Sequence, residues 1–298
     1  MSFRAQGPTL RPVAIGRPES GRTTLSARLN KATNMNSSAT TSFTEPTSQQ
    51  RVALVTGGAV GLGAAISKRL ARDGFTVLVA DIDDKASDVT VAEIIASQGR
   101  AAALHMDVGS PESIAEAFAE ISERYGRCDV LVNNAGISNI TEFLDVGLER
   151  WNRTMQINVT GPLLCSQAAA RLMRTRSWGR IINISSISGI RAGAGRTSYG
   201  TSKAAVIGLT KQMAIELAQY GITANSVAPG PVDTPMTREL HSDKTRESYV
   251  RGIPAKRYAT PEEIAGAVAY FTTDDAAYVN GHILPVDGGF VAAGLLEI

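Results

Sequence analysis

Two side chains in the middle of the chain have the types and the spacing needed to move a proton. Tyr199 and Lys203 lie four residues apart at the start of a segment with helical periodicity, thirteen residues after Ser186. Side chains four residues apart on a helix share one face. An ammonium group beside a phenol stabilises the phenolate, so a tyrosine that ordinarily titrates at about 10 can exchange a proton at a lower pH. The spacing therefore predicts an acid–base pair.

Composition and charge exclude several classes of protein. The chain has 298 residues, of which 43% are apolar and 19% charged, and no apolar run reaches the length of a membrane span. Cys128 and Cys165 form neither a metal-type cluster nor a disulfide framework, and the three histidines are scattered. We therefore expect a cytoplasmic protein from a reducing compartment, with no metal site, no histidine-based triad and no membrane partner.

The first 49 residues differ from the rest in composition. They are rich in Ser, Thr, Arg, Pro and Gly, and residues 1–44 hold six basic residues and one acid, which leaves 24 basic and 27 acidic residues elsewhere. We expect residues 1–49 to be a tail and residues 50–298 to be one folded domain. A disordered tail, a natural start at Met35 and an organelle transit peptide in residues 1–34 all fit this composition. The mildly acidic remainder predicts no nucleic-acid partner.

From Arg51 onward, short apolar runs alternate with segments of helical spacing. Ser110 and Thr260 each precede a proline and a glutamate, which is typical of a helix N-terminus. This alternation predicts an α/β fold, a single Rossmann-type, doubly wound parallel sheet of about seven strands with helices on both faces. Pro285 cannot donate to a strand ladder, so we expect its strand at the sheet edge, or Pro285 on the unpaired side of its strand. The predicted strands are Arg51–Thr56, Thr76–Asp81, Ala101–Asp107, Asp129–Asn133, Arg180–Ser185, Ile222–Ala228 and Ile283–Asp287.

A glycine-rich turn, Thr56 to Gly63, joins the first strand to a helix predicted from about Ala64 to Arg72. Glycines at such a turn let the backbone approach a pyrophosphate, which then lies at a helix N-terminus. An ordinary tight turn is the simpler alternative. The position between a buried strand and a helix favours a dinucleotide site.

Asp81 ends the second predicted strand, eighteen residues after Gly63. A carboxylate there can accept hydrogen bonds from the adenosine ribose and would repel the additional phosphate of NADP. The neighbouring Asp83 and Asp84 add to this repulsion, and the glycine turn contains no arginine or lysine. We therefore expect NAD as the cofactor, although Asp81 could instead cap a helix and Lys85 could reach a phosphate.

These motifs together resemble the short-chain dehydrogenase/reductase family. The resemblance runs from Arg51 to about Phe290. After the glycine turn it rests on Asn133-Asn134-Ala135-Gly136, on Asn158, on Ser186, on Tyr199 with Lys203, and on the segment from Pro229 to Thr234. The one mild departure is Ala59-Val60 inside the glycine turn, where many members have serine or arginine.

The resemblance implies a role for each of four catalytic residues. Tyr199 would transfer the proton to or from the substrate oxygen, and Lys203 would lower its pKa and bind the nicotinamide ribose. Ser186 would position the reacting oxygen, and Asn158 would help to hold a water that links Lys203 to solvent. Cofactor contacts are implied for Gly57, Val60, Gly61, Leu62, Gly63, Asp81, Ile82, Asp107, Val108, Asn134, Ala135, Gly136, Tyr199, Lys203, Pro229, Gly230, Val232 and Thr234.

The same resemblance indicates an enzyme that interconverts a secondary alcohol and a ketone with NAD. The sequence is similar to sugar and polyol dehydrogenases and also to 3-oxoacyl-(acyl-carrier-protein) reductases of the family, and a catalytically inactive dinucleotide-binding regulator is a third alternative. The substrate pocket is expected between residues 138–140, 187–196 and 231–254, with Arg191 or Arg196 against a polar or anionic substrate group. A homotetramer, or a dimer, is the assembly that the resemblance implies.

Overall fold

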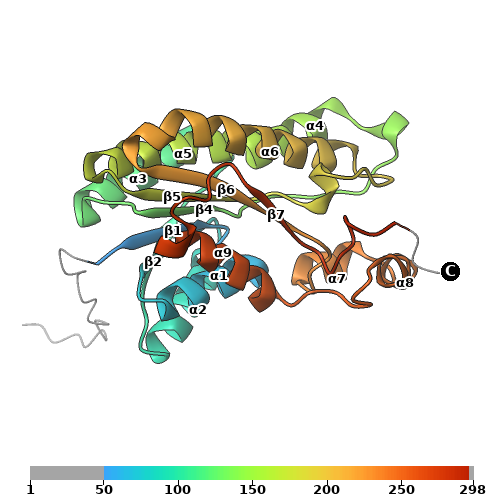
Figure 1. The fold of residues 1–298 in the computed structure, drawn as a ribbon, viewed down its shortest axis with the longest axis horizontal. Helices are drawn as coiled ribbons and strands as arrows, with labels where there is room; N and C mark the ends of the chain where they lie inside the picture. The colour runs from blue at the N-terminus through green and yellow to red at the C-terminus, as the bar shows by residue number, and fades with distance from the viewer. Residues whose placement is uncertain (1–49, 295–298) are drawn as a thin grey trace, which may run out of the picture. The chain divides into compact units, whose positions relative to one another are not determined.

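A parallel seven-stranded sheet lies at the centre of the computed structural model, which describes residues 50–294 (Figure 1). The strand order is β3–β2–β1–β4–β5–β6–β7, which confirms the predicted doubly wound sheet. The predictions for residues 1–49 lie outside the described residues. The strands are β1 (Val52–Thr56), β2 (Thr76–Asp81), β3 (Arg100–His105), β4 (Val130–Asn133), β5 (Gly179–Ile184), β6 (Ile222–Pro229) and β7 (Ile283–Val286).

The strand ends follow from pairing and burial. Every residue of β1, β4, β5 and β6 is buried, as continuous apolar runs predict. β3 ends at His105, two residues earlier than predicted, because its partner β2 ends at Asp81, the residue that pairs with His105. β7 pairs only with β6 and carries Pro285, so the predicted edge position is confirmed.

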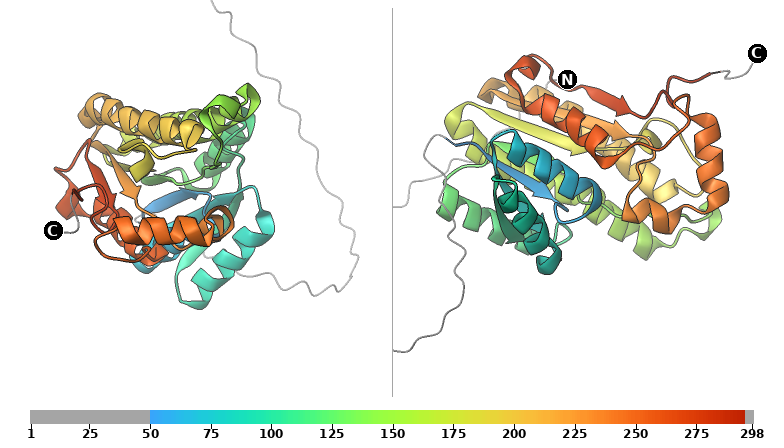
Figure 2. Two further views of the ribbon diagram at one scale, coloured as in Figure 1. Left: turned by 90° about the vertical axis from the view of Figure 1, so that its right-hand side faces the viewer. Right: turned by 90° about the horizontal axis from the view of Figure 1, so that it is seen from below.

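Helices cover both faces of the sheet and enclose two hydrophobic cores. One face is covered by α3, α5 and α6, and the opposite face by α1, α2 and α9, with α1 and α9 side by side (Figure 2). Ser110 and Thr260 cap α3 and α9 as predicted. The helices are α1 (Gly61–Arg72), α2 (Asp84–Ala96), α3 (Pro111–Tyr125), α4 (Leu148–Met155), α5 (Gly161–Met173), α6 (Thr197–Leu217), α7 (Pro235–Leu240), α8 (Asp243–Gly252) and α9 (Pro261–Thr272).

Two helices depart from their expected course. α1 begins at Gly61, because the glycine turn itself forms the first helical turn and Ala64 N donates to Val60 O. The long helix around Asn158 is interrupted by a π-helical segment, Gln156–Thr160, between α4 and α5. Pro162 explains the interruption, because it has no N–H to donate to the Asn158 carbonyl four residues earlier.

The connection after β6 forms a separate substructure beyond the carboxyl ends of the strands. It contains α7 and α8 and returns to α9 (Figure 1). Across residues 50–294, none of the helices combines the length and the apolar character needed to traverse a lipid bilayer.

Candidate active site

The four predicted catalytic residues come from three elements. Ser186 follows β5, Tyr199 and Lys203 lie on α6, and Asn158 lies on the π-helical segment. The Ser186 side chain lies beside the Tyr199 phenol and acts to lower the pKa of that phenol. The Lys203 Nζ atom lies 5.7 Å from the centre of the Tyr199 ring. The structure therefore places the serine, the phenol and the ammonium together at one end of the sheet.

Burial dominates the electrostatics of this pair. It raises the pKa of Tyr199, while the hydrogen bond from Ser186 and the positive charge of Arg196 act in the opposite direction. Burial also lowers the pKa of Lys203 to about 8. The Lys203 ammonium donates to the Ile184 carbonyl at 2.8 Å, so in this arrangement Arg196 is the cation that favours the phenolate. The lowering of the Tyr199 pKa by Lys203 stays a prediction.

The Asn158 side chain is fully buried and holds the backbone after β4. Its amide nitrogen donates to Ile137 O at 2.9 Å and to Ser202 Oγ at 3.0 Å, and its oxygen accepts from Ile137 N at 2.9 Å. Ser202 in turn donates to Tyr199 O. Asn158 thus connects the segment after β4 to the catalytic helix, while its predicted part in holding a water stays a prediction.

The glycine turn has the shape that a pyrophosphate site requires. Gly57 and Gly61 have φ values of +61° and +55°, a backbone region that favours glycine. A Cβ atom on Gly63 would lie 1.8 Å from Gly57 O, so no side chain fits there. The first turn of α1 contains no acidic residue. Backbone N–H groups at a helix N-terminus, with no side chain in the way, can donate hydrogen bonds to the diphosphate of a dinucleotide.

Asp81 lies beside this turn with its carboxylate held by the backbone. Its Oδ2 atom accepts from Ala59 N at 3.2 Å and its Oδ1 atom from Ile82 N at 2.8 Å. Val60 and Ile82 are exposed apolar side chains at the same strand ends. The carboxylate therefore stays within the turn rather than capping α2, whose N-cap is Asp83.

The remaining predicted cofactor residues also lie at carboxyl ends of strands. Asn134 donates to Thr56 O and Gly57 O, and the backbone N–H groups of Asn134 and Ala135 donate to the Thr56 hydroxyl. A Cβ atom added to Gly136 would lie 3.5 Å from Lys203 Nζ. A Cβ atom added to Gly61 would lie 3.7 Å from Thr234 Cβ. Leu62 lies in the first turn of α1, Asp107 and Val108 follow β3, Pro229 ends β6, and Gly230 and Val232 follow it.

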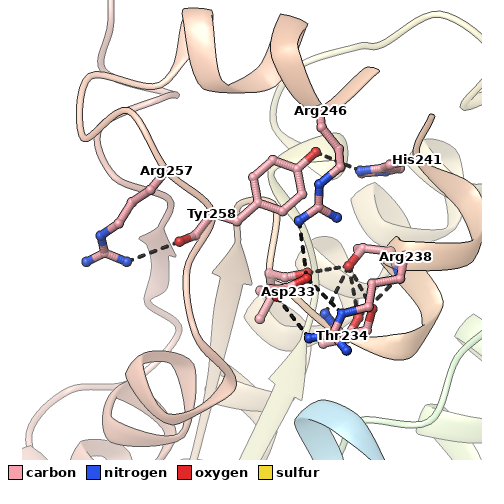
Figure 3. A network of polar contacts seen from close by, with 9 residues as sticks. Asp233, Thr234, Arg238, His241, Arg246, Arg257 and Tyr258 are labelled. Atoms are coloured by element: carbon pink, nitrogen blue, oxygen red, sulfur yellow. Dashed lines mark hydrogen bonds and ion pairs between the residues drawn. The ribbon is translucent and has the colours of Figure 1, made fainter. Parts of the chain in front are cut away.

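The structure adds a polar network that the sequence did not predict, and Figure 3 shows the part of it around His241, Tyr258 and Asp233. His241, between α7 and α8, is a hydrogen-bond partner of Arg196 at 2.8 Å and of the Tyr258 hydroxyl at 2.9 Å. Arg196 also donates to Ser138 Oγ at 2.9 Å. Thr56, the first residue of the glycine turn, also belongs to the site through its hydroxyl, although the sequence predicted no role for it. No spacing signal marks the network, because its members come from separate loops.

The two arginines considered for the substrate pocket have different surroundings. Arg191 donates to Phe290 O and lies over the Phe290 ring, whereas Arg196 lies 5.8 Å from the centre of the Tyr199 ring. A cavity lined in part by Ile253, Arg257 and Gly288 includes none of the four predicted catalytic residues. Arg196 is therefore the arginine beside the candidate chemistry.

Comparisons with known proteins identify relatives of this chain in sequence and in fold. A family model described as enoyl-(acyl carrier protein) reductase matches residues 57–291. A 3-oxoacyl-(acyl-carrier-protein) reductase from Synechocystis is 42% identical over 81% of this chain and 97% of its own length. The short-chain reductase protein NovJ from Streptomyces niveus is 40% identical over 81% and 94%.

Solved structures give the same fold. A putative gluconate dehydrogenase from Agrobacterium tumefaciens aligns with a TM-score of 0.80 at 36% identity, over 82% of this chain and 97% of its own. A gluconate 5-dehydrogenase from Burkholderia cenocepacia, in complex with NADP and tartrate, aligns with a TM-score of 0.79 at 32% identity, over 82% and 96%. The chain belongs to the short-chain dehydrogenase/reductase family of oxidoreductases.

Proposed function

We propose that the chain is an NAD-dependent oxidoreductase that interconverts a secondary alcohol and a ketone. The observation that carries this proposal is the placement of Ser186 at the Tyr199 phenol, where it favours the ionised form, with the Lys203 ammonium 5.7 Å from the centre of the phenol ring. The reacting oxygen of the substrate would lie between the two hydroxyl groups. NAD, when bound, supplies the hydride acceptor, or in its reduced form the hydride donor.

In the oxidising direction, Tyr199 as phenolate takes the hydroxyl proton while the hydrogen on carbon leaves as hydride. The C–O single bond of the alcohol becomes the C=O double bond of the ketone. Loss of one proton and one hydride accounts for this two-electron oxidation. Ser186 donates a hydrogen bond to the oxygen on which negative charge develops. In the reducing direction Tyr199 returns the proton. Lys203 would bind the nicotinamide ribose.

The preference for NAD rests on Asp81. Its carboxylate lies in the turn between Ala59 N and Ile82 N, where the additional phosphate of NADP would meet a like charge. Gluconate 5-dehydrogenases among the structural neighbours have been crystallised with NADP. The proposal therefore predicts that this chain differs from those neighbours in cofactor preference.

A second candidate substrate class is a 3-oxoacyl thioester. Three 3-oxoacyl-(acyl-carrier-protein) reductases that are 37–42% identical to this chain favour this class. The reacting group is still a ketone, and the roles of Ser186, Tyr199 and Lys203 are the same. What differs is the pocket beyond them.

Steady-state assays with NAD, NADP, NADH and NADPH test this proposal. Substrates should include secondary alcohols, polyols, gluconate and an acetoacetyl thioester. We expect turnover with NAD or NADH, and a loss of kcat of about 10²- to 10⁴-fold in Tyr199→Phe. Unaltered activity of Tyr199→Phe on every substrate would refute the enzymatic role. Reduction of only the thioester would favour the second candidate.

The family resemblance also supports a homotetramer. Leu163 on α5 and Ile215 on α6 are exposed apolar residues on two long helices. The edge strand β7 is only partly buried within one chain. These surfaces fit an interface between copies of the chain.

A further inference from the structure

Arg196 occupies a fixed position at the start of the catalytic helix. It is the N-cap of α6, its N–H donates to Gly193 O, and its backbone forms a bridge with Thr141. Its guanidinium carbon lies 5.8 Å from the centre of the Tyr199 ring. These contacts fix the backbone that carries a cation beside the phenol. The inference that follows rests on the proposed function.

The partners of this guanidinium are neutral. One is the Ser138 hydroxyl at 2.9 Å and the other is His241 Nε2 at 2.8 Å. An arginine N–H can only donate, so Nε2 is the unprotonated acceptor and Nδ1 carries the proton toward the Tyr258 hydroxyl. Burial and the charges of Arg196 and Arg246 lower the pKa of His241, which agrees with a neutral ring.

The Asp233 carboxylate, which belongs to the same network, is already paired with other arginines. Asp233 forms ion pairs with Arg238 at 3.0 Å and with Arg246 at 3.3 Å. Within residues 50–294, no carboxylate lies at ion-pair distance from Arg196. Asp233 is thus shared by the guanidinium groups of Arg238 and Arg246 (Figure 3), and the charge of Arg196 has no carboxylate partner among the described residues.

The guanidinium also has donors to spare. It carries five N–H groups, and two hydrogen bonds account for its polar contacts in the described part of the chain. A planar guanidinium fork with unused N–H donors can bind a carboxylate through two parallel hydrogen bonds. We propose that Arg196, positioned by Ser138 and His241, binds a carboxylate group of the substrate. The substrate class is then a hydroxy acid, with the corresponding oxo acid as product.

Binding of tartrate and threitol to the protein saturated with NAD tests this proposal. The two probes share a four-carbon skeleton, but threitol has hydroxymethyl groups in place of the carboxylates. Isothermal titration calorimetry should give measurable affinity for tartrate and much weaker affinity for threitol. Arg196→Gln should weaken tartrate by about 10- to 100-fold, and Arg196→Lys by less, because the charge stays and the fork is lost.

Two controls and one further readout make the result specific. Arg191→Gln changes an exposed arginine of the same segment and should leave tartrate affinity unaltered. NADH affinity, followed by fluorescence, should be the same in wild type and Arg196→Gln, which shows that the fold persists. In alcohol oxidation, Arg196→Gln should move the rising limb of the pH profile to higher pH. The reason is that the variant removes a cation that lowers the pKa of Tyr199.

The outcomes separate this inference from the proposed function. Equal affinity for tartrate and threitol, or unaltered tartrate affinity in Arg196→Gln, would overturn it even if alcohols are oxidised. Loss of thioester reduction in Arg196→Gln without any tartrate binding would assign Arg196 to a thioester carbonyl and also overturn it. Tyr199→Phe should still bind tartrate, so failure of the catalytic role alone leaves this result intact.

Discussion

The nucleotide side and the substrate side of the proposed active site are built in different ways. The nucleotide side, residues 56–63 with Asp81, is shaped by the backbone: glycines with positive φ, helix amides and a carboxylate held by three N–H groups. The substrate side, Ser138, Arg196, His241 and Tyr258, is held by side chains from three separate segments. One side depends on local conformation and the other on contacts over long sequence distances.

This difference predicts different responses to mutation. On the nucleotide side, one added methyl group meets backbone that cannot move aside. On the substrate side, loss of one hydrogen bond leaves other contacts in place, such as the stacking of His241 on Tyr249 at 5.3 Å. We therefore expect all-or-none effects on the first side and graded effects on the second.

Gly63→Ala should give the largest effect. Its Cβ would lie 1.8 Å from Gly57 O, so the turn must open and the pyrophosphate amides must move. We expect the dissociation constant for NADH, measured by fluorescence titration, to rise by about 100-fold or more. A change of this size corresponds to contacts worth roughly several kcal/mol.

Gly266→Ala is the matched control for this change. It adds the same methyl group in the middle of α9, where the nearest contact is the end of Arg69 at 3.5 Å. Helix propensity then stabilises the protein by about 0.5–1 kcal/mol. If Gly63→Ala bound NADH like wild type, the nucleotide side would be as adaptable as the substrate side, and the contrast would be lost.

Asp81→Ser should give the next largest effect, confined to cofactor choice. Removal of the carboxylate removes a like charge from the site of the additional NADP phosphate. The ratio of kcat/KM for NADP to that for NAD should rise by about 10- to 100-fold. Asp88→Asn is the control: it removes one negative charge at an exposed position of α2, away from the turn, and should leave the ratio unchanged. An equal shift in both variants would mean that overall charge, and not the Asp81 carboxylate, sets the preference.

Most of the fold could be predicted from the sequence because its signals are local. Buried apolar runs marked the seven strands, and Pro285 marked the edge of the sheet. The π-helical segment at Gln156–Thr160 was missed, although Pro162 in the chain removes the N–H that an α-helix would need there. Helical periodicity alone does not distinguish a continuous helix from one interrupted by a single wider turn.

The residues of the candidate site also differ in how local their sequence signals are. The glycine turn and Asp81 are close in sequence or linked by one strand pairing, so spacing revealed them. The contact of Arg196 with His241 spans 45 residues and that of His241 with Tyr258 spans 17, across loops without periodicity. Such contacts depend on how α7 and α8 fold back, which no short motif encodes.

Tyr258→Phe should give the smallest of these effects. The phenol oxygen is the acceptor for His241 Nδ1 at 2.9 Å, and both side chains are buried. Its removal leaves a buried N–H without that partner, at a cost of about 1–3 kcal/mol, which is a fall in Tm of roughly 2–4 °C per kcal/mol. The cofactor affinity should not change, since the nucleotide side shares none of these contacts. Tyr278→Phe removes a fully exposed hydroxyl and should leave Tm unaltered. Equal melting curves for the two variants would show that the hydrogen bond from His241 adds no stability, and that the substrate side is held by packing alone.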